Sequence, residues 1–192
     1  MGLESQPIGV FLSEVASENV APAGGSCAAV VGAMGASLCE MACIHTVNDE
    51  EHTDGKPDLV DAGEELTSLR EQLLHLAEAD AAVVAGLPAA FDGNQTHVKR
   101  ATGIPLAIAE SCLHVLEAAI VVTAEGKKTV LPDVKSGMFF TEAALRAALF
   151  TVRTNIGYLD NPSFVEKMNQ QTDEIEASAE NMLDEIRPKL AI

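Results

Sequence analysis

Aromatic and basic side chains are scarce in this sequence. There is no Trp and one Tyr among 192 residues, so the composition is typical of helical rather than all-β proteins. Twelve Lys and Arg stand against 29 Asp and Glu, which gives a formal charge of −17. Because that charge repels a phosphate backbone and an anionic membrane, we expect no nucleic acid and no membrane as partners. As a hypothesis, the acid excess fits a cytosol of high salt, and a melting temperature unaffected by added salt would refute it.

Several familiar site motifs are also missing. The four cysteines lack the spacing of a disulfide framework, and the N-terminus lacks a basic segment before an apolar core, so we expect a cytoplasmic location. Cys39 and Cys43 stand one helical turn apart without a second Cys or His pair, so no metal site is expected. Without a Gly-x-Gly-x-x-Gly, Walker or Gly-x-Ser-x-Gly motif, nucleotide and serine-hydrolase chemistry lack support.

Apolar periodicity predicts an all-α fold over residues 1–192, a single domain of up-and-down type with about six helices. No pair of strands is convincing. Pro105 is expected in the first turn of the fourth helix, and Asn161 with Pro162 at the start of the sixth. The predicted helices cover residues 8–17, 26–46, 58–87, about 105–124, a stretch after 132 to 156, and 162 to about 186.

The predicted helix 26–46 is apolar or small on every side, which indicates a buried helix. A membrane span is the alternative, because the run is long enough to cross a bilayer. Glu40 interrupts it and no basic flank follows, and its small residues also suit tight contacts in a soluble core. We therefore favour the buried helix.

Asp80 lies inside the apolar seam of the predicted helix 58–87. The seam runs at intervals of 3, 4, 3, 4, 3 and 4 residues through Leu66, Leu69, Leu73, Leu76, Asp80, Val83 and Leu87. A carboxylate in such a seam is paired, hydrogen-bonded or protonated, since desolvation raises its pKa, and it can then act as an acid or base near neutrality. The alternative is a structural Asp bonded to a neighbouring helix terminus or an Arg, or a polar residue that fixes the register of the helices.

Two further groups of residues are candidates for binding an anion. Gly24, Gly25 and Ser26 lead into a helix, and this predicts backbone amides and a hydroxyl N-cap at the positive end of its dipole; an ordinary capped junction is the alternative. Arg146, Arg153 and Asn155 follow Asp133 and three lysines, Lys127, Lys128 and Lys135. This stretch holds five of the twelve basic residues, although a solvated face with ion pairs explains it equally well.

With these residues in view, the chain resembles the cyclodeaminase domain of formiminotransferase-cyclodeaminase, a family that includes stand-alone methenyltetrahydrofolate cyclohydrolases. The likeness covers nearly the whole length. The matching segments are 11–17 (FLSEVAS), 22–29 (PAGGSCAA), 32–36 (GAMGA), 78–81 (EADA), 104–106 (IPL), and 133 through 142–146 (EAALR) to 152–155 (VRTN). Ala23 replaces the first Gly of the family's usual triple, and the segment 87–103 looks shortened.

The resemblance implies a homodimer that binds a tetrahydrofolate derivative as substrate, with no tightly bound cofactor. Asp80 falls on the family's proposed catalytic Asp. Gly24, Gly25 and Ser26, with Arg or Lys, would hold the glutamate tail of the folate, and Asp133 or Asn155 would bind the pterin edge. Arg153 is also expected among the substrate-binding residues.

Two reactions are candidates, and both take place at the carbon that bridges N5 and N10 of the folate. A single acid/base residue could catalyse either of them. We favour methenyltetrahydrofolate cyclohydrolase, because the sequence contains no formiminotransferase domain. Formimidoyltetrahydrofolate cyclodeaminase, supplied by a separate formiminotransferase, is the alternative. A non-catalytic helical module that binds folate or mediates assembly is the alternative from another class.

Overall fold

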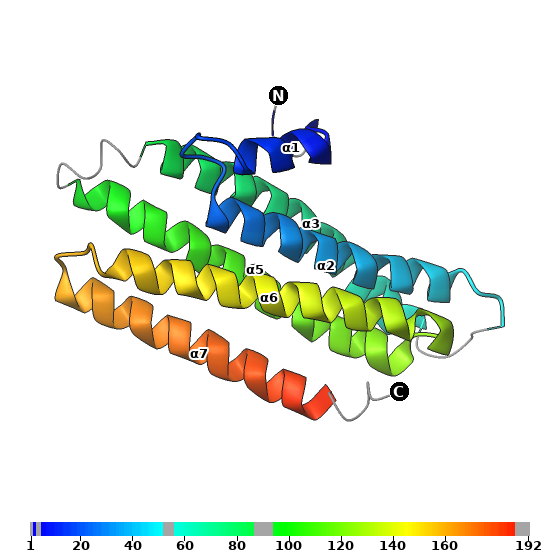
Figure 1. Cartoon of the computed structure of the whole chain (residues 1–192). Helices are drawn as coiled ribbons and strands as arrows, with labels where there is room; N and C mark the ends of the chain where they lie inside the picture. Colours follow the sequence, from blue (N-terminus) through cyan, green and yellow to red (C-terminus); the bar gives the residue numbers. More distant parts are fainter. Residues whose placement is uncertain (1, 3–4, 52–55, 87–93, 187–192) are drawn as a thin grey trace.

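The described residues form six α-helices and one 3-10 turn, in a computed structural model that describes residues 2, 5–51, 56–86 and 94–186 (Figure 1). The all-helical prediction is therefore confirmed for this part of the chain. The elements are α1 (Ile8–Val15), α2 (Gly24–Val47), α3 (Lys56–Ala85), α5 (Gln95–Glu125), η2 (Lys128–Val130), α6 (Leu131–Ile156) and α7 (Pro162–Ile186).

Four long helices, α2, α3, α5 and α6, form the core of the bundle, and each runs opposite to the one before it (Figure 1). We call the end where α2 and α5 begin the amino end of the bundle, and the end where they finish the carboxyl end. The last helix, α7, packs along α5 and α6, while α1 lies outside the core on the side of α2 and α3.

The packing of α2 against α6 explains the small residues of α2. A Cβ added at Gly35 would overlap the side chain of Thr141 and lie 2.7 Å from the carbonyl oxygen of Gly137. A Cβ at Gly137 would lie 2.8 Å from the carbonyl oxygen of Gly35. The two backbones therefore touch at the crossing, which any larger side chain would prevent.

Two predictions about helices need correction. The first is that α2 is buried on every side: its outer face is open, and Met34 and Ile44 are 48% and 51% exposed. The second is the start of the fourth helix, which begins at Gln95 rather than near Pro105, so that this proline is inside the helix. Asn94 provides the true N-cap by accepting a hydrogen bond from the amide of His97. The predicted end of the third helix at Leu87 lies outside the described residues.

Two helices, α2 and α5, are long and apolar enough to cross a membrane when judged by length and composition alone. Within their most apolar windows, 50% of α2 and 56% of α5 is buried in the bundle. Core helices of soluble proteins share this property. The structure uses both helices as core elements that pack against α3 and α6.

Candidate functional site

Asp80 points into the bundle from the last two turns of α3. The seam residues Leu66, Leu69, Leu73 and Val83 are buried, as the spacing predicts, and they fix which side of α3 faces the core. Asp80 lies on the same side and is 3% exposed. It therefore occupies the core position that its place in the seam predicts.

The carboxylate of Asp80 meets the first turn of α2. Ser26 donates a hydrogen bond from its hydroxyl to Oδ2 of Asp80 at 2.8 Å, and its backbone amide also bonds this carboxylate. Gly25 makes the approach possible, because a Cβ at this position would overlap the carboxylate. Two of the groups singled out in the sequence, Asp80 and the Gly24–Ser26 turn, thus lie together.

The arrangement differs from the predicted hydroxyl cap. Ala23 is the N-cap of α2, in extended conformation and without a side-chain cap bond, so Ser26 lies inside the first turn. Helix N-termini leave their first amides without partners inside the helix. Here one of those amides, that of Ser26, donates a hydrogen bond to the carboxylate of Asp80 on the neighbouring helix α3. In an ordinary N-cap the acceptor would be a side chain of α2 itself.

Burial raises the pKa of Asp80 above the ordinary value of an Asp, and this is the largest influence on it. The hydroxyl and amide of Ser26 oppose the change, because both stabilise the ionised form. Asp80 is thus hydrogen-bonded and poorly hydrated at once. A carboxyl group in that position can exchange a proton with a ligand closer to neutral pH than an exposed one.

Cys27 is the accessible thiol beside this carboxylate. It is partly buried, and its pKa is raised by burial and by the charge of Asp80. Cys39, Cys43 and Cys112 are buried, with pKa values raised to about 12, about 11 and about 12. Cys27 has no role predicted from the sequence, and only the fold shows that this thiol lies beside Asp80.

Arg153 is held by α7 rather than by the Asp80 site. Its Nη2 atom lies 3.1 Å from Oδ1 of Asp173 and 2.6 Å from Oε2 of Glu176. Arg146 is paired with Glu142 on its own helix, at 3.1 Å, and lies 3.7 Å from Glu180 of α7. Both arginines therefore fasten α7 to α6, and their charges are already compensated.

Asn155 satisfies a backbone oxygen that Pro105 leaves without a partner. Proline has no amide hydrogen, so the carbonyl of Ala101, four residues earlier in α5, receives no helical hydrogen bond from it. The side-chain amide of Asn155 donates to that carbonyl oxygen at 2.7 Å. The residue thus lies at the amino end of the bundle, with its amide nitrogen engaged in joining α6 to α5.

Asp133 lies at the opposite end of the bundle. It is in the first turn of α6, about 25 Å along the helix from the level of Phe150 near the amino end. Lys127, Lys128 and Lys135 are at the same carboxyl end, and Lys127 pairs there with Asp49 at 3.0 Å. The structure therefore does not bring Asp133 and Asn155 together within one chain.

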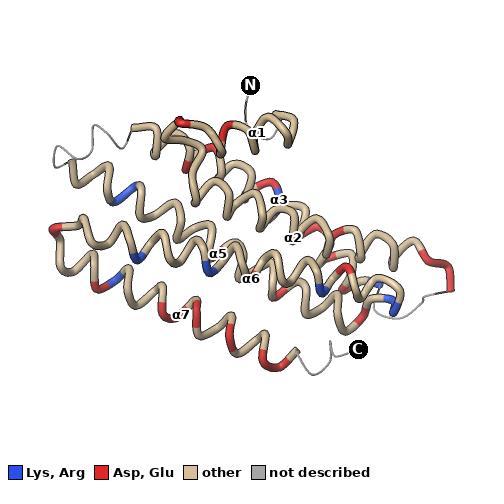
Figure 2. Tube along the Cα trace, viewed as in Figure 1, with Lys and Arg blue, Asp and Glu red and all other residues tan. Residues whose placement is uncertain are grey.

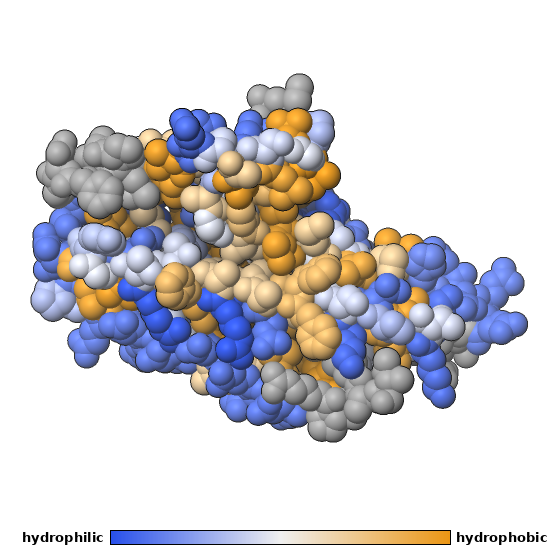
Figure 3. Space-filling view, viewed as in Figure 1, coloured by the Kyte–Doolittle hydropathy of each residue, from blue (hydrophilic) through white to orange (hydrophobic). Residues whose placement is uncertain are grey.

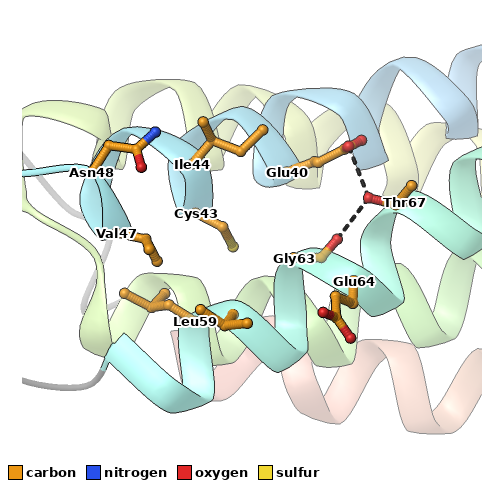
Figure 4. A pocket seen from close by; sticks show the side chains of 10 residues that line it. Glu40, Cys43, Ile44, Val47, Asn48, Leu59, Gly63, Glu64 and Thr67 are labelled. Carbon is orange, nitrogen blue, oxygen red and sulfur yellow. Dashed lines mark hydrogen bonds between the residues drawn. The ribbon is translucent and has the colours of Figure 1, made fainter.

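Among the described residues, a cavity of about 260 Å³ opens between α2 and α3 at the carboxyl end (Figure 4). Its wall is mainly apolar, and Glu40 lies at its edge, where it accepts a hydrogen bond from Thr67 at 2.8 Å and pairs with Arg70 at 2.9 Å. These polar groups satisfy one another. The cavity does not include Asp80.

Two further residues lie near the site: His97, which carries no clear signal in the sequence, and Glu78, which the sequence shows only as the neighbour of Asp80 in the family-like segment 78–81. His97 lies beside Gly86, and its Nε2 atom is 3.0 Å from the carbonyl oxygen of Val83, which joins the start of α5 to the end of α3. It falls in a stretch predicted as a loop. Glu78 stands two residues before Asp80, so it faces another side of α3. Its Oε1 atom is buried and accepts no hydrogen bond from the described residues.

Comparisons with known proteins agree on one family. A family model described as formiminotransferase-cyclodeaminase matches residues 7–174. A protein of Methylorubrum extorquens (strain AM1) named methenyltetrahydrofolate cyclohydrolase is 31% identical over 189 residues, with 91% of each chain covered. The crystal structure of formiminotetrahydrofolate cyclodeaminase from Thermotoga maritima superposes with a TM-score of 0.94 at 22% identity, over 98% of this chain and 97% of that one. At 22% identity, the similarity to this solved structure supports the fold alone.

Proposed function

Since this chain belongs to the formiminotransferase-cyclodeaminase family of enzymes that act on folate derivatives, we propose that it is a methenyltetrahydrofolate cyclohydrolase with Asp80 as its acid/base. The reaction converts 5,10-methenyltetrahydrofolate and water to 10-formyltetrahydrofolate. The observation that carries the proposal is a buried carboxylate, held at the first turn of α2 by Ser26 and raised in pKa by desolvation.

The chemistry needs one group that takes and returns a proton. Ionised Asp80 accepts a proton from the water that attacks the bridging carbon, which gives a tetrahedral adduct. Asp80 then donates this proton to N5 as the bond from carbon to N5 breaks. The hydroxyl proton of the adduct leaves to solvent as the formyl C=O forms, so that atoms and charge balance.

The electrostatics of the site suit this substrate. The methenyl bridge is cationic, and a carboxylate that is poorly hydrated attracts a cation more strongly than one in bulk water. The free amides at the start of α2 suit an anionic group of the folate, such as its glutamate tail. We therefore place the substrate across the Gly24–Ser26 turn, with its bridge at Asp80.

The cyclohydrolase is favoured over the cyclodeaminase by the relative of that name, which matches over 91% of both chains. In the cyclodeaminase reaction the same residue would assist attack by N10 and protonate the departing ammonia. The roles of Asp133, Arg153 and Asn155 in folate binding stay predictions. Unchanged folate affinity in Asp133→Asn would remove the role of that residue.

The test is to incubate the pure protein with methenyltetrahydrofolate and, separately, with formimidoyltetrahydrofolate, while following the methenyl absorbance. We expect loss of absorbance with the first substrate. Appearance of absorbance with the second substrate would instead indicate the cyclodeaminase. No change with either would favour the non-catalytic module.

Asp80→Asn keeps the shape of the side chain but cannot take up the proton, so we expect turnover to fall by about 10²- to 10⁴-fold. The matched control is Glu65→Gln, which removes an exposed carboxylate from the same helix. A near-normal rate in Asp80→Asn would assign this residue to structure.

Bound folate should also slow alkylation of Cys27, the accessible thiol next to Ser26.

A further inference from the structure

The cavity between α2 and α3 lies far from Asp80. Gly63 of α3 lines it, at about 25 Å along the helix from Asp80. The apolar part of its wall consists of Cys43, Ile44 and Val47 from α2 and of Leu59 and Val60 from α3. Figure 4 shows the two helices bordering this space. None of these residues has a part in the proposed reaction.

The space is large enough for a small molecule. An apolar cavity of about 150 Å³ is known to bind benzene. This cavity holds about 260 Å³, so it has room for a ring with a short substituent. Gly63 keeps the space open, because a Cβ at this position would lie 3.4 Å from the Cβ of Cys43 and a longer side chain would enter the cavity.

Two large apolar side chains of the wall are in contact with water. Ile44 on α2 is 51% exposed and Val60 on α3 is 42% exposed. Figure 3 shows hydrophobic atoms over the second half of α2, with hydrophilic atoms beyond them at the carboxyl end of the bundle. An occupant of the cavity would remove apolar surface of both side chains from water, and this favours binding.

Polar side chains close one end of the cavity and satisfy one another. Thr67 donates its hydroxyl to Oε1 of Glu40 at 2.8 Å and lies 2.9 Å from the carbonyl oxygen of Gly63. Oε2 of Glu40 accepts a hydrogen bond from Nε of Arg70 at 2.9 Å. Among the described residues that line the cavity, no buried side-chain oxygen or nitrogen lacks a partner. The interior therefore offers water few hydrogen bonds and favours an apolar occupant.

The charge around the cavity is negative. Two of the described lining residues, Glu40 and Glu64, are carboxylates, and none is Lys or Arg. Arg70 compensates Glu40, whereas Glu64 is exposed and pairs with no Lys or Arg in the part of the chain that the structure describes. Three acidic residues, 49–51, follow α2 directly, and Figure 2 shows them as a red segment at the end of that helix. A cation is therefore attracted here, and an anion is repelled.

Two lysines close to this end of α2 already have partners. Lys56 donates to the carbonyl oxygens of Val47 and Asp49, both at 2.9 Å, and so completes the end of α2. Lys127 pairs with the carboxylate of Asp49 at 3.0 Å. Neither ammonium group pairs with Glu64, so the charge of Glu64 is available to a ligand.

We propose that this cavity binds a small organic amine in its protonated form. Its apolar group, a ring or a branched chain, lies between Ile44 and Leu59, and its ammonium group donates hydrogen bonds to the carboxylate of Glu64. The apolar group gains from leaving water, and the charged hydrogen bond selects a cation over a neutral molecule of the same shape. Because the cavity is remote from Asp80, the proposal does not depend on the proposed reaction.

The dimensions of the cavity favour a free small molecule over a protein partner. A protein that binds stably buries about 800 Å² on each partner. The cavity instead offers a concave space of about 260 Å³, with an apolar wall and a few polar groups at its edge. Sites for small molecules have this character, because the apolar wall supplies affinity and the polar groups fix the orientation.

Three probes of similar shape test the charge of the ligand. Benzylamine, benzyl alcohol and benzoate share a ring and are cationic, neutral and anionic at neutral pH. By calorimetry with the full chain, we expect benzylamine to bind about three- to tenfold more tightly than benzyl alcohol, and benzoate to bind least. In methyl NMR spectra, benzylamine should shift the signals of Val47 and Leu59, which locates it in the cavity.

Glu64→Gln tests the residue that selects the cation. This change keeps the shape of the side chain and removes its charge, so the preference for benzylamine over benzyl alcohol should disappear while the affinity for the alcohol stays the same. The matched control is Glu65→Gln, at the next residue, which faces the groove between α3 and α5. This control should keep the preference.

Gly63→Leu fills the cavity, so it should weaken the binding of both benzylamine and benzyl alcohol by about tenfold or more. Val60→Ser takes its place if Gly63→Leu does not fold, because this residue is partly exposed and lines the same cavity. It should weaken both probes by a smaller factor. Equal affinity for amine and alcohol, an unchanged preference in Glu64→Gln, or no shift at Val47 and Leu59 with about 10 mM benzylamine would overturn the proposal.

Discussion

Asp80 combines two properties that are usually found apart. It caps a helix terminus by accepting a hydrogen bond from the amide of Ser26, and this bond stabilises the ionised carboxylate. It is also buried, and burial destabilises the ionised carboxylate. Burial has the larger effect, so its pKa lies above the ordinary value. The two interpretations of this residue offered by the sequence, an acid/base and a partner of a helix terminus, are therefore compatible at a single position.

The raised pKa of Asp80 has a consequence for stability. The folded protein binds the proton of Asp80 more tightly than the unfolded chain, so ionised Asp80 lowers stability above its raised pKa. This cost disappears as pH falls through the raised pKa to the ordinary value of about 4. Asp80→Asn cannot ionise and should be more stable than wild type at pH 7, with an advantage that shrinks toward pH 4.

Urea unfolding at a series of pH values measures this difference. Glu65→Gln serves again as the control, since its exposed carboxylate should give a nearly constant difference from wild type. An Asp80→Asn advantage that is the same at pH 7 and pH 4 would contradict a raised pKa.

Asn155 supplies the hydrogen bond that Pro105 cannot donate to the carbonyl oxygen of Ala101. We expect Asn155→Ala to cost about 1–3 kcal/mol, because the carbonyl oxygen of Ala101 loses its donor. In a Pro105→Ala background the new amide can bond the same oxygen, so the cost should be smaller. Chemical denaturation of the four chains of this double-mutant cycle gives both values. Equal costs in the two backgrounds would mean that the proline does not create the need for Asn155.

At the scale of the elements, the close packing of α2 against α6 depends on the absence of side chains at Gly35 and Gly137. Gly137→Ala forces a methyl group against the carbonyl oxygen of Gly35, and overpacking of this kind costs about 1–3 kcal/mol. Gly103→Ala is the control, because a Cβ at this position in α5 meets nothing within 4 Å. Here we expect a gain of about 0.5–1 kcal/mol from the better helix former. Thermal melts compare the two, and a neutral Gly137→Ala would mean that the helices can separate without penalty.

Sequence periodicity predicts some elements well and others poorly, for physical reasons. The seam of α3 is clear because one face is buried along the whole helix, and that face includes Asp80. The first ten residues of α5 are missed because Pro105 reads as a helix start, while the compensating donor, Asn155, is 50 residues away in the sequence. Long-range bonds of this kind leave no local pattern.

At the scale of the whole molecule, the site is predicted only in part. The meeting of Asp80 with the Gly24–Ser26 turn follows once α2 and α3 are known to be antiparallel neighbours. The basic residues around α6, which the sequence suggests as one anion site, do not lie together. The helix is long enough to place its first residues and Arg153 at opposite ends of the bundle. Which charges are already paired, as Arg153 is with α7, depends on packing that composition does not reveal.

Hydrogen bonds between helices at both ends also fix how the core helices are aligned along their axes. At the amino end the bonds are Ser26 to Asp80 and Asn155 to Ala101. At the carboxyl end the amide of Lys127, just after α5, donates to the hydroxyl of Thr46 in α2 at 3.2 Å. Sliding one of these helices by a single turn, about 5.4 Å, would break the bonds that it makes. A rearrangement that slid α2, α3, α5 or α6 along its axis is therefore opposed at the amino end or the carboxyl end of the bundle, and for α2 and α5 at both.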